Sequence, residues 1–439
     1  MRDGKVMNRN LVVVGAILIQ LCLGAIYAWS VFTPALTDAG WSKTQTQAVF
    51  AAGLAAFAVV MVLAGRMMPK VGPRRLAVAG GVLLGAGYAL AGVFGATSFP
   101  VVFVFVGLVG GAGIGLAYVV PIAVGMRWFP DKKGLITGLA VAGFGFGATL
   151  WITLAHSLGP VGGGRLIATL GLATTFIIYG AAYFVMVLIG SVWMVFPPDG
   201  WKPAGYRPPE AAQAGAKPVA GTVDFTSGEM LTTPQFYMIL LTFAFGASAG
   251  LMSIGLMKLF PMSALQGAGF EKADASAAAS LAMGVFFALA NGLGRIIWGT
   301  VSDKLGRRAS IAIMMGTQGI FVITFQWMAG MLMGGQPVPL YLWAALIGFN
   351  FGGNFALFPT ITADTFGTKY VGQNYGWVFL AYGIGGIFGP ILGGRLGDLG
   401  NFPLAFTICG VLCLVAAGII AMVKHPTKPA RAAPQTAEA

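Results

Sequence analysis

The chain has 439 residues, of which 57% are hydrophobic and only 9% are charged. Soluble globular domains carry roughly 25% charged residues, so this composition excludes a water-soluble protein and indicates an integral membrane protein. The net charge of +13 comes from short basic clusters between hydrophobic runs. That pattern is typical of the cytoplasmic loops of a multi-pass membrane protein and argues against nucleic acid as a partner.

The first apolar stretch, Leu11 to Phe32, follows a short basic leader. It is too long for the core of a secretory signal and lacks a small-residue cleavage site, so we expect a retained transmembrane helix. The three cysteines all lie in apolar stretches and predict neither a disulfide framework nor a metal site; they are Cys22, Cys409 and Cys413.

A helix of about 20 apolar residues crosses a bilayer, and the lengths of the apolar runs predict twelve such helices. Six precede and six follow residues 197–233, a Pro-, Ala- and Gly-rich stretch that we interpret as a central cytoplasmic linker. We therefore expect an all-α membrane fold of two six-helix bundles, 1–196 and 234–424, with a cytoplasmic tail at 425–439. The predicted helices are 11–34, 44–68, 76–96, 99–126, 134–157, 171–196, 235–260, 275–299, 309–332, 339–363, 372–394 and 402–423.

The distribution of basic residues predicts the orientation. With the amino terminus inside, the cytoplasmic segments hold 20 of the 26 lysines and arginines, and the outer loops hold five. Cytoplasmic loops are enriched in Lys and Arg, so both termini are expected in the cytoplasm and the protein in the plasma (inner) membrane. The remaining basic residue, Arg295, lies inside a predicted helix.

The two halves repeat one another. The loops "GRMMPKVGPRR" (65–75) and "GTVSDKLGRRA" (299–309) each join the second and third helix of their half, and Pro121 in the fourth helix recurs as Pro359 in the tenth. Two parallel repeats with a long middle loop are the plan of many secondary transporters.

These loops resemble the signature of the major facilitator superfamily, a glycine, an acidic residue and a basic cluster at fixed spacing. The second copy matches fully, whereas Pro69 replaces the acidic residue of the first. The resemblance implies a gating role on the cytoplasmic side and a weaker latch in the first half. The matching residues are Gly299, Asp303, Gly306, Arg307 and Arg308.

A narrower resemblance covers most of the chain. Four stretches resemble the oxalate:formate antiporter branch, and the first of them is also similar to monocarboxylate transporters. They are "RWFPDKKGLITGLAVAGFGFG" (127–147), "FTSGEMLTTPQF" (225–236), "ALFPTITADTFG" (356–367) and "NYGWVF" (374–379).

Arg295 is the main candidate for substrate binding. A charge within a membrane span costs roughly 2.5–3.5 kcal/mol. The alternative is that it snorkels toward Asp303, about 12 Å further along the helix at 1.5 Å per residue. Helical side chains tilt toward the amino-terminal end, so we expect Arg295 to point toward the bilayer centre instead. Its forked donors suit a carboxylate, and the resemblance implies that an arginine here binds the substrate anion.

Further candidates surround it. Asn291 lies one turn before Arg295 on the same face, where animal monocarboxylate transporters carry an aspartate, although ordinary hydrogen bonding between helices is the alternative. Tyr382 lies where the oxalate transporter has a second cation, a lysine, so the resemblance disfavours oxalate and favours a single carboxylate. The resemblance also implies aromatic cavity residues at Tyr27, Tyr118, Phe355 and Phe379.

The predicted function is secondary transport of a small monocarboxylate, most simply L-lactate, with a proton, by alternating access. All 13 acidic residues fall in loops, tails or helix ends; Asp274 is the nearest candidate for proton coupling, and entry of substrate and proton together is the alternative. Exchange of oxalate- or formate-type anions is the second interpretation. A membrane enzyme, a sensor or a drug exporter fits less well, because no reactive constellation, output domain or buried acid is apparent. No cofactor is expected, and we expect a monomer.

Overall fold

The structure is a computed structural model, and it describes residues 7–129, 133–155, 166–198, 201–203, 223–367, 370–424 and 426. Within these residues the regular secondary structure is helical, apart from one isolated bridge between Met333 and Gln336. Most of the predicted linker and nearly all of the predicted tail lie outside the described residues.

The first half contains six long helical segments, some of them interrupted by a change of helix type. A 3₁₀ stretch follows α1, and a π-helical stretch joins α5 to α6. The elements are α1 (Asn10–Leu23), η1 (Gly24–Val31), α2 (Thr33–Asp38), α3 (Lys43–Val71), α4 (Pro73–Gly95), α5 (Phe99–Val102), η2 (Phe103–Gly110), α6 (Gly111–Trp128), α7 (Lys133–Ala155) and α8 (Leu166–Ser191).

The second half follows the same plan. This half also contains a π-helical stretch, which interrupts its second long segment, between α12 and α13. The elements are α9 (Ser227–Leu231), α10 (Pro234–Leu256), α11 (Leu259–Gly267), α12 (Lys272–Leu281), η3 (Ala282–Phe287), α13 (Ala288–Leu305), α14 (Arg307–Met328), α15 (Val338–Phe366), α16 (Val371–Asp398) and α17 (Phe402–Ala421).

The twelve predicted helices are confirmed. Among the described residues, eleven helices are long and apolar enough to cross a membrane, and a shorter apolar helix, within α7, occupies the remaining place in the order. Several helix ends differ from the predicted ones by a few residues, and one predicted helix is divided: 235–260 ends at Leu256, and α11 begins separately at Leu259. Pro261 explains this break, because it has no N–H to donate to the carbonyl four residues earlier.

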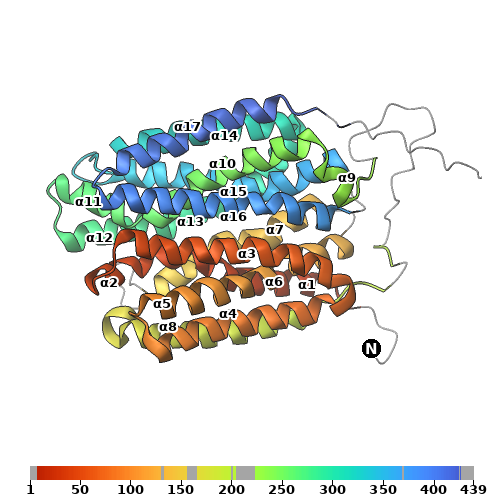
Figure 1. Cartoon of the computed structure of the whole chain (residues 1–439), viewed down its shortest axis with the longest axis horizontal. Helices are drawn as coiled ribbons and strands as arrows, with labels where there is room; N and C mark the ends of the chain where they lie inside the picture. The colour runs from red at the N-terminus through yellow and green to blue at the C-terminus, as the bar shows by residue number, and fades with distance from the viewer. Residues whose placement is uncertain are drawn as a thin grey trace, which may run out of the picture.

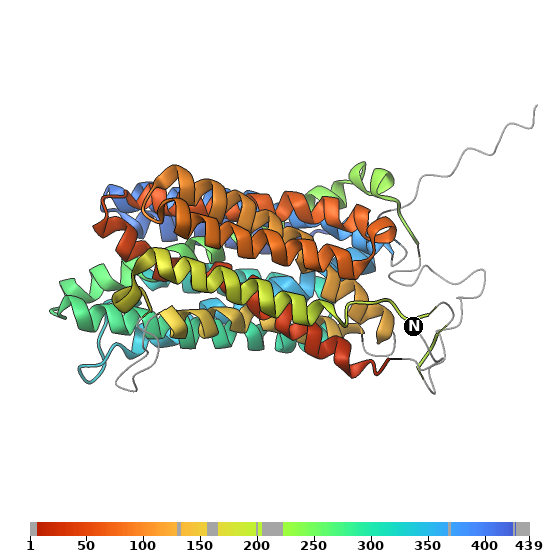
Figure 2. The same cartoon turned by 90° about the horizontal axis from the view of Figure 1, so that it is seen from below.

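The helices run side by side along one long axis (Figures 1 and 2). Helices of the first half, red to yellow, occupy the lower part of Figure 1, and those of the second half, green to blue, the upper part. The halves meet where α3 packs against α16 and α7 against α13. The short helices α2, α11 and α12 lie together at one end and α9 at the other (Figure 1).

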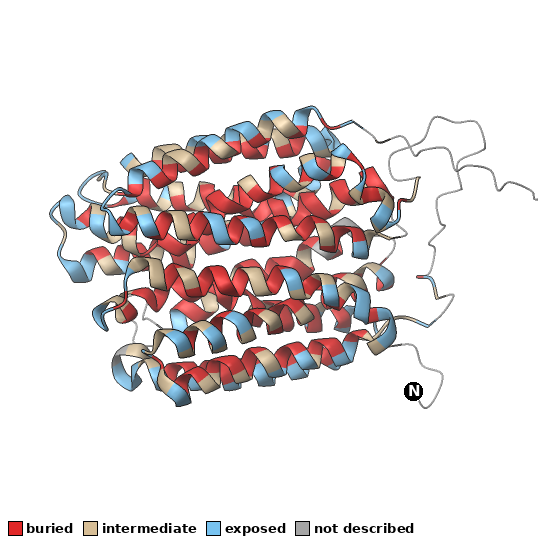
Figure 3. Cartoon of the chain, in the orientation of Figure 1, coloured by how far each residue is buried: buried red, intermediate tan, exposed pale blue. Residues whose placement is uncertain are grey.

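Burial follows this arrangement. Buried residues line the inner faces of the helices, and exposed ones the outer faces and the two ends (Figure 3). Many exposed side chains on the outer helices are large and apolar, such as Val93 and Phe94 on α4 and Ile320 on α14. A continuous apolar exterior of this kind is unusual for a soluble monomer and matches a surface in contact with lipid.

The repeat seen in the sequence extends to backbone and hydrogen bonds. Gly72 and Gly306 both have φ of 88°, a region that favours glycine, and each is the sole residue between two long helices. Two residues later, Arg74 donates to the carbonyl of Val192 and Arg308 to that of Val423. In each half, the third helix is thus tied to the end of the sixth.

Glycines allow α4 and α8 to pack in direct backbone contact. A Cβ atom added to Gly180 would lie 2.4 Å from the carbonyl oxygen of Gly85, and rigid backbone cannot yield as a flexible side chain does. Small residues commonly permit such close approach between membrane helices.

We predict that Gly180→Ala lowers the melting temperature of the purified protein, because overpacking costs about 1–3 kcal/mol. Gly418→Ala is the matched control, since nothing lies within 4 Å of its added Cβ and helical Gly→Ala substitutions are neutral or stabilising. Equal melting temperatures for the two variants would contradict the close contact.

Candidate substrate-binding site

Arg295 lies on α13 at the interface between the halves, and it is fully buried. Its Nε and Nη2 donate to Oδ1 of Asn291 at 3.1 and 3.0 Å. The guanidinium therefore reaches back one turn toward the amino-terminal end of the helix, which is the direction expected for a helical side chain. It does not snorkel toward Asp303.

Groups from both halves complete the surroundings of this cation: Phe355 of the second half, and Val141 and Phe144 of the first. Nη1 donates to the carbonyl oxygen of Val141 on α7 at 2.8 Å. The guanidinium carbon lies 4.1 Å from the ring centre of Phe355 and 5.4 Å from that of Phe144, within the range of cation–π attraction. Arg295 thus links α13 to α7 across the interface.

No carboxylate among the described residues forms an ion pair with Arg295. Asp303, the nearest acid along the helix, pairs instead with Arg307 at 2.5 Å. Removing one partner from a buried ion pair is strongly destabilising because it leaves a buried charge uncompensated. Here neutral groups surround the charge, an arrangement that suits an arginine whose counter-charge comes from a ligand.

Three tyrosines surround the guanidinium. The hydroxyl of Tyr382 donates to that of Tyr27 at 3.0 Å across the interface. The hydroxyls of Tyr27 and Tyr118 interact electrostatically with Arg295. All three side chains are at most 1% exposed, so the predicted residues come together at one buried place.

The predicted aromatic residues form the walls. Phe379 stacks on Tyr382 with ring centres 4.9 Å apart, and Phe355 meets the same tyrosine at 5.5 Å. Phe57 and Phe144 from the first half complete this box, with Phe57 lying 5.0 Å from Tyr118 and 5.1 Å from Phe379. The sequence analysis missed both, although Phe144 lies within the matched stretch 127–147.

Several buried polar groups around Arg295 have no hydrogen-bond partner within the described residues. They are the amide nitrogen of Asn291 and the hydroxyls of Tyr118 and Tyr375. Tyr375, on α16, also interacts electrostatically with Arg295 and was not predicted from the sequence. Since buried polar groups are normally paired, these donors have the chemistry to bind an acceptor-only group such as a carboxylate.

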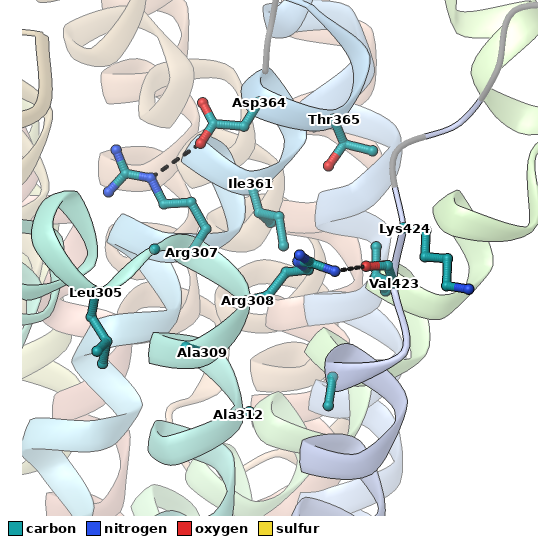
Figure 4. Close-up of a pocket in the computed structure, with 12 residues that line it drawn as sticks. Leu305, Arg307, Arg308, Ala309, Ala312, Ile361, Asp364, Thr365, Val423 and Lys424 are labelled. Carbon is teal, nitrogen blue, oxygen red and sulfur yellow. Dashed lines mark hydrogen bonds and ion pairs between the residues drawn. The ribbon is translucent and has the colours of Figure 1, made fainter. Parts of the chain in front are cut away.

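The predicted gating residues lie at the cytoplasmic ends of α13 and α14. Arg307 bonds to Asp303, to Ser302 and, at 3.3 Å, to Asp364 of α15. Figure 4 shows this last ion pair together with the contact between Arg308 and Val423. These contacts lie within the second half and hold together the ends of its helices.

Other residues join the two halves toward the ends of the bundle. Near the cytoplasmic end, the guanidinium of Arg66 lies 5.2 Å from the ring of Trp377. At the outer end, Asp398 of α16 accepts from the backbone N–H of Lys43 and Thr44 at 3.0 and 3.1 Å and from the Thr44 hydroxyl. The carboxylate thereby caps the first turn of α3, a favourable position for an anion. Sequence patterns gave no signal for it.

Asp274, the candidate for proton coupling, is exposed in the first turn of α12. It precedes Arg295 by 21 positions in nearly continuous helix, about 30 Å at 1.5 Å per residue. A second titratable side chain, Lys258, is buried close to α12. Its ammonium donates to the carbonyl of Ser276, to the Ser276 hydroxyl at 2.8 Å and to the hydroxyl of Ser280.

Burial lowers the pKa of Lys258 to about 7. Helices α10 and α11, which flank Lys258, carry no charged residue. The charged residues of α12 and its N-cap are Glu271, Lys272 and Asp274, and none of them forms an ion pair with Lys258 in the described part of the chain. Lys258 lies one turn beyond Gly255, whose carbonyl accepts from Gln47 of the other half at 3.2 Å. Separation of the halves here would expose this face to water.

A family comparison agrees with this architecture. The family model described as Major Facilitator Superfamily matches residues 14–286 and 272–439. The chain belongs to the major facilitator superfamily. It is therefore a multi-pass transporter of the plasma membrane, built on the twelve-helix plan of that superfamily.

Three curated relatives are similar to this chain over most of its length. The uncharacterized MFS-type transporter YhjX of Escherichia coli (strain K12) is 29% identical over 87% of this chain and 86% of its own length. The oxalate:formate antiporter of Oxalobacter formigenes is 28% identical over 96% and 92%, respectively. The apicoplast pyruvate carrier 1 of Toxoplasma gondii is 24% identical over 84% and 80%.

We predict that Asp398→Ala shifts the population toward outer-open molecules, because an anion at a helix N-terminus contributes about 0.3–1 kcal/mol. Spin labels at the exposed residues Ala39 and Ala268, one in each half, would report longer distances by double electron–electron resonance. The native cysteines are buried. An unchanged distance distribution would show that this cap does not hold the outer end closed.

We also predict that the same distances depend on pH. A hydrated lysine has a pKa of about 10.4, whereas the buried Lys258 has a pKa of about 7. Between pH 7 and about 10, Lys258 is therefore protonated when the outer end is open and neutral when it is closed. Raising the pH from 7 to 9 should therefore favour the closed outer end. Lys258→Met should abolish this dependence, whereas Lys202→Met, at an exposed lysine, should retain it.

Proposed function

We propose that this transporter moves a small monocarboxylate, with L-lactate as the first candidate, together with a proton by alternating access. The observation that carries the proposal is the buried cation of Arg295, which has no acid partner among the described residues and is surrounded by donors without acceptors. A carboxylate accepts several hydrogen bonds through two oxygens and would supply both the negative charge and the missing acceptors.

The number of cations supports a single carboxylate. Arg295 is the one basic side chain of this group of described residues, and the resemblance implies that Tyr382 lies where the oxalate transporter has a lysine. One carboxylate neutralises one guanidinium, whereas a dianion would leave a negative charge in a low-dielectric interior, which is expensive. The aromatic walls suit a substrate with a short apolar body.

The contacts of Arg295 also favour symport over obligatory exchange. The carbonyl of Val141 and the amide oxygen of Asn291 accept three of its hydrogen bonds. These neutral acceptors would let the halves close over the arginine without a bound anion, a step that a symporter requires and an obligatory exchanger avoids. Proton entry together with the carboxylate keeps the cycle electroneutral.

Anion exchange is the second candidate. It is supported by the similarity to the oxalate:formate antiporter, which extends over 96% of this chain. Counterflow separates the two functions: in proteoliposomes lacking internal anion, a symporter accumulates labelled lactate when the outside is acidic, and an obligatory exchanger takes up none.

The decisive variant is Arg295→Ala. We predict that it abolishes lactate uptake driven by a pH gradient, because a lost hydrogen bond to a charged group costs about 1.5–3 kcal/mol and Arg295 would supply more than one. Lys202→Ala removes an exposed positive charge outside the site and is the control. Normal uptake by the Arg295 variant would refute the proposal. A melting temperature equal to that of the unmodified protein shows that a loss of uptake does not come from misfolding.

We predict that Tyr382→Lys changes the selectivity. A second cation beside Arg295 should raise the affinity for dicarboxylates such as oxalate relative to lactate. Competition of a dicarboxylate panel against labelled lactate measures the ratio, and Tyr382→Phe controls for loss of the bond to Tyr27. If lysine and phenylalanine give the same ratio, the number of cations does not set the selectivity.

A further inference from the structure

A cavity lies far from Arg295, at the cytoplasmic ends of α14, α15 and α17. Its volume is about 540 Å³, large enough for a phospholipid headgroup. Figure 4 shows it between the first turn of α14, the last turn of α15 and the chain that leaves α17. The proposed transport cycle assigns it no role.

Among the charged residues of the lining, basic residues outnumber acidic ones. Arg307, Arg308 and Lys424 supply three positive charges, and Asp364 supplies one negative charge. Arg307 is occupied by its acidic partners, but Arg308 uses one donor, to the carbonyl of Val423 at 2.6 Å. The other guanidinium donors and the ammonium of Lys424 have no protein acceptor in the described part of the chain. The cavity thus carries a net positive charge with unused donors.

Two further features point to an anion. The first turn of the 22-residue helix α14 borders the cavity, and its N-cap, Gly306, offers no side chain to its N–H groups; such a terminus attracts phosphate. Independently, Thr365 lines the cavity and is only 7% exposed, yet its hydroxyl makes no hydrogen bond to any described residue. Figure 4 shows this hydroxyl turned toward the cavity.

The location indicates where the anion comes from. The outer faces of α14 and α17 expose Ile313 and Val415, at 49% each, and Met422, at 64%, lies beside the cavity. These exposed apolar residues belong to the helices that border the cavity. Ala312, Ile361 and Ala421 add apolar lining. A molecule with an anionic head and an apolar tail matches both the basic part of the cavity and the apolar side chains beside it. A free phosphate matches only the basic part.

We propose that this cavity binds the phosphate group of an acidic phospholipid from the cytoplasmic leaflet. Arg308, Lys424, Thr365 and the first N–H groups of α14 hold the phosphate, and the acyl chains extend along α14 and α17. The lipid thereby ties together three helix ends of the second half.

Native mass spectrometry of the purified protein, titrated with phosphatidylglycerol and with zwitterionic phosphatidylcholine, tests this site. We expect one tight phosphatidylglycerol site that Arg308→Ala weakens about tenfold and Lys424→Ala about fivefold. Arg74→Ala is the matched control, because Arg74 makes the equivalent carbonyl contact in the first half; it should leave the affinity unchanged.

A second measurement guards against misfolded variants. Phosphatidylglycerol should raise the melting temperature of the unmodified protein, and Thr365→Val, a nearly isosteric change that keeps both arginines, should reduce this rise. Equal lipid affinity in all variants would overturn the proposal. If millimolar inorganic phosphate raises the melting temperature and phosphatidylglycerol does not, the cavity binds a soluble anion and the lipid proposal is overturned.

Discussion

A permanent positive charge held at the interface of two helical bundles by neutral groups alone is the constraint around which this molecule is arranged. Arginine stays protonated under all physiological conditions, so the charge of Arg295 must be compensated rather than removed. The amide of Asn291, the carbonyl of Val141 and the ring of Phe355 compensate it in part. Two of these groups belong to the second half and one to the first, so any movement between the halves changes the surroundings of the charge.

Close helix packing serves the same site. A Cβ atom on Gly145 would lie 2.7 Å from Oδ1 of Asn291, the oxygen that accepts from Arg295. Glycine at this position lets α7 approach α13 closely enough for the carbonyl of Val141 to reach the guanidinium. The glycines of the stretch 127–147 therefore bear on the geometry of the cation as well as on the packing of helices.

Much of this arrangement could be predicted from the sequence, because hydropathy indicates which segments lie in the lipid and basic residues indicate which loops face the cytoplasm. The twelve helices, the repeated loops and the isolation of Arg295 all follow from that one-dimensional signal. The contacts of Val141, Tyr375 and Asp398 depend instead on how helices distant in sequence are rotated and shifted against each other. A backbone carbonyl has no residue-type signature, and a cap or an aromatic side chain supplied by a helix distant in sequence falls outside the local patterns that a sequence search reads.

The cap on α3 has a thermodynamic consequence for the whole cycle. Ser42 satisfies the N–H of Gln45 within the first half, whereas the N–H groups of Lys43 and Thr44 depend on Asp398 of the second half. One turn of helix is thus completed by the opposite bundle, and water must replace the carboxylate whenever the bundles part. The stability of the first turn of α3 is therefore coupled to the equilibrium between closed and open outer ends. Hydrogen exchange at the amides of Lys43 and Thr44 would record how often this end opens.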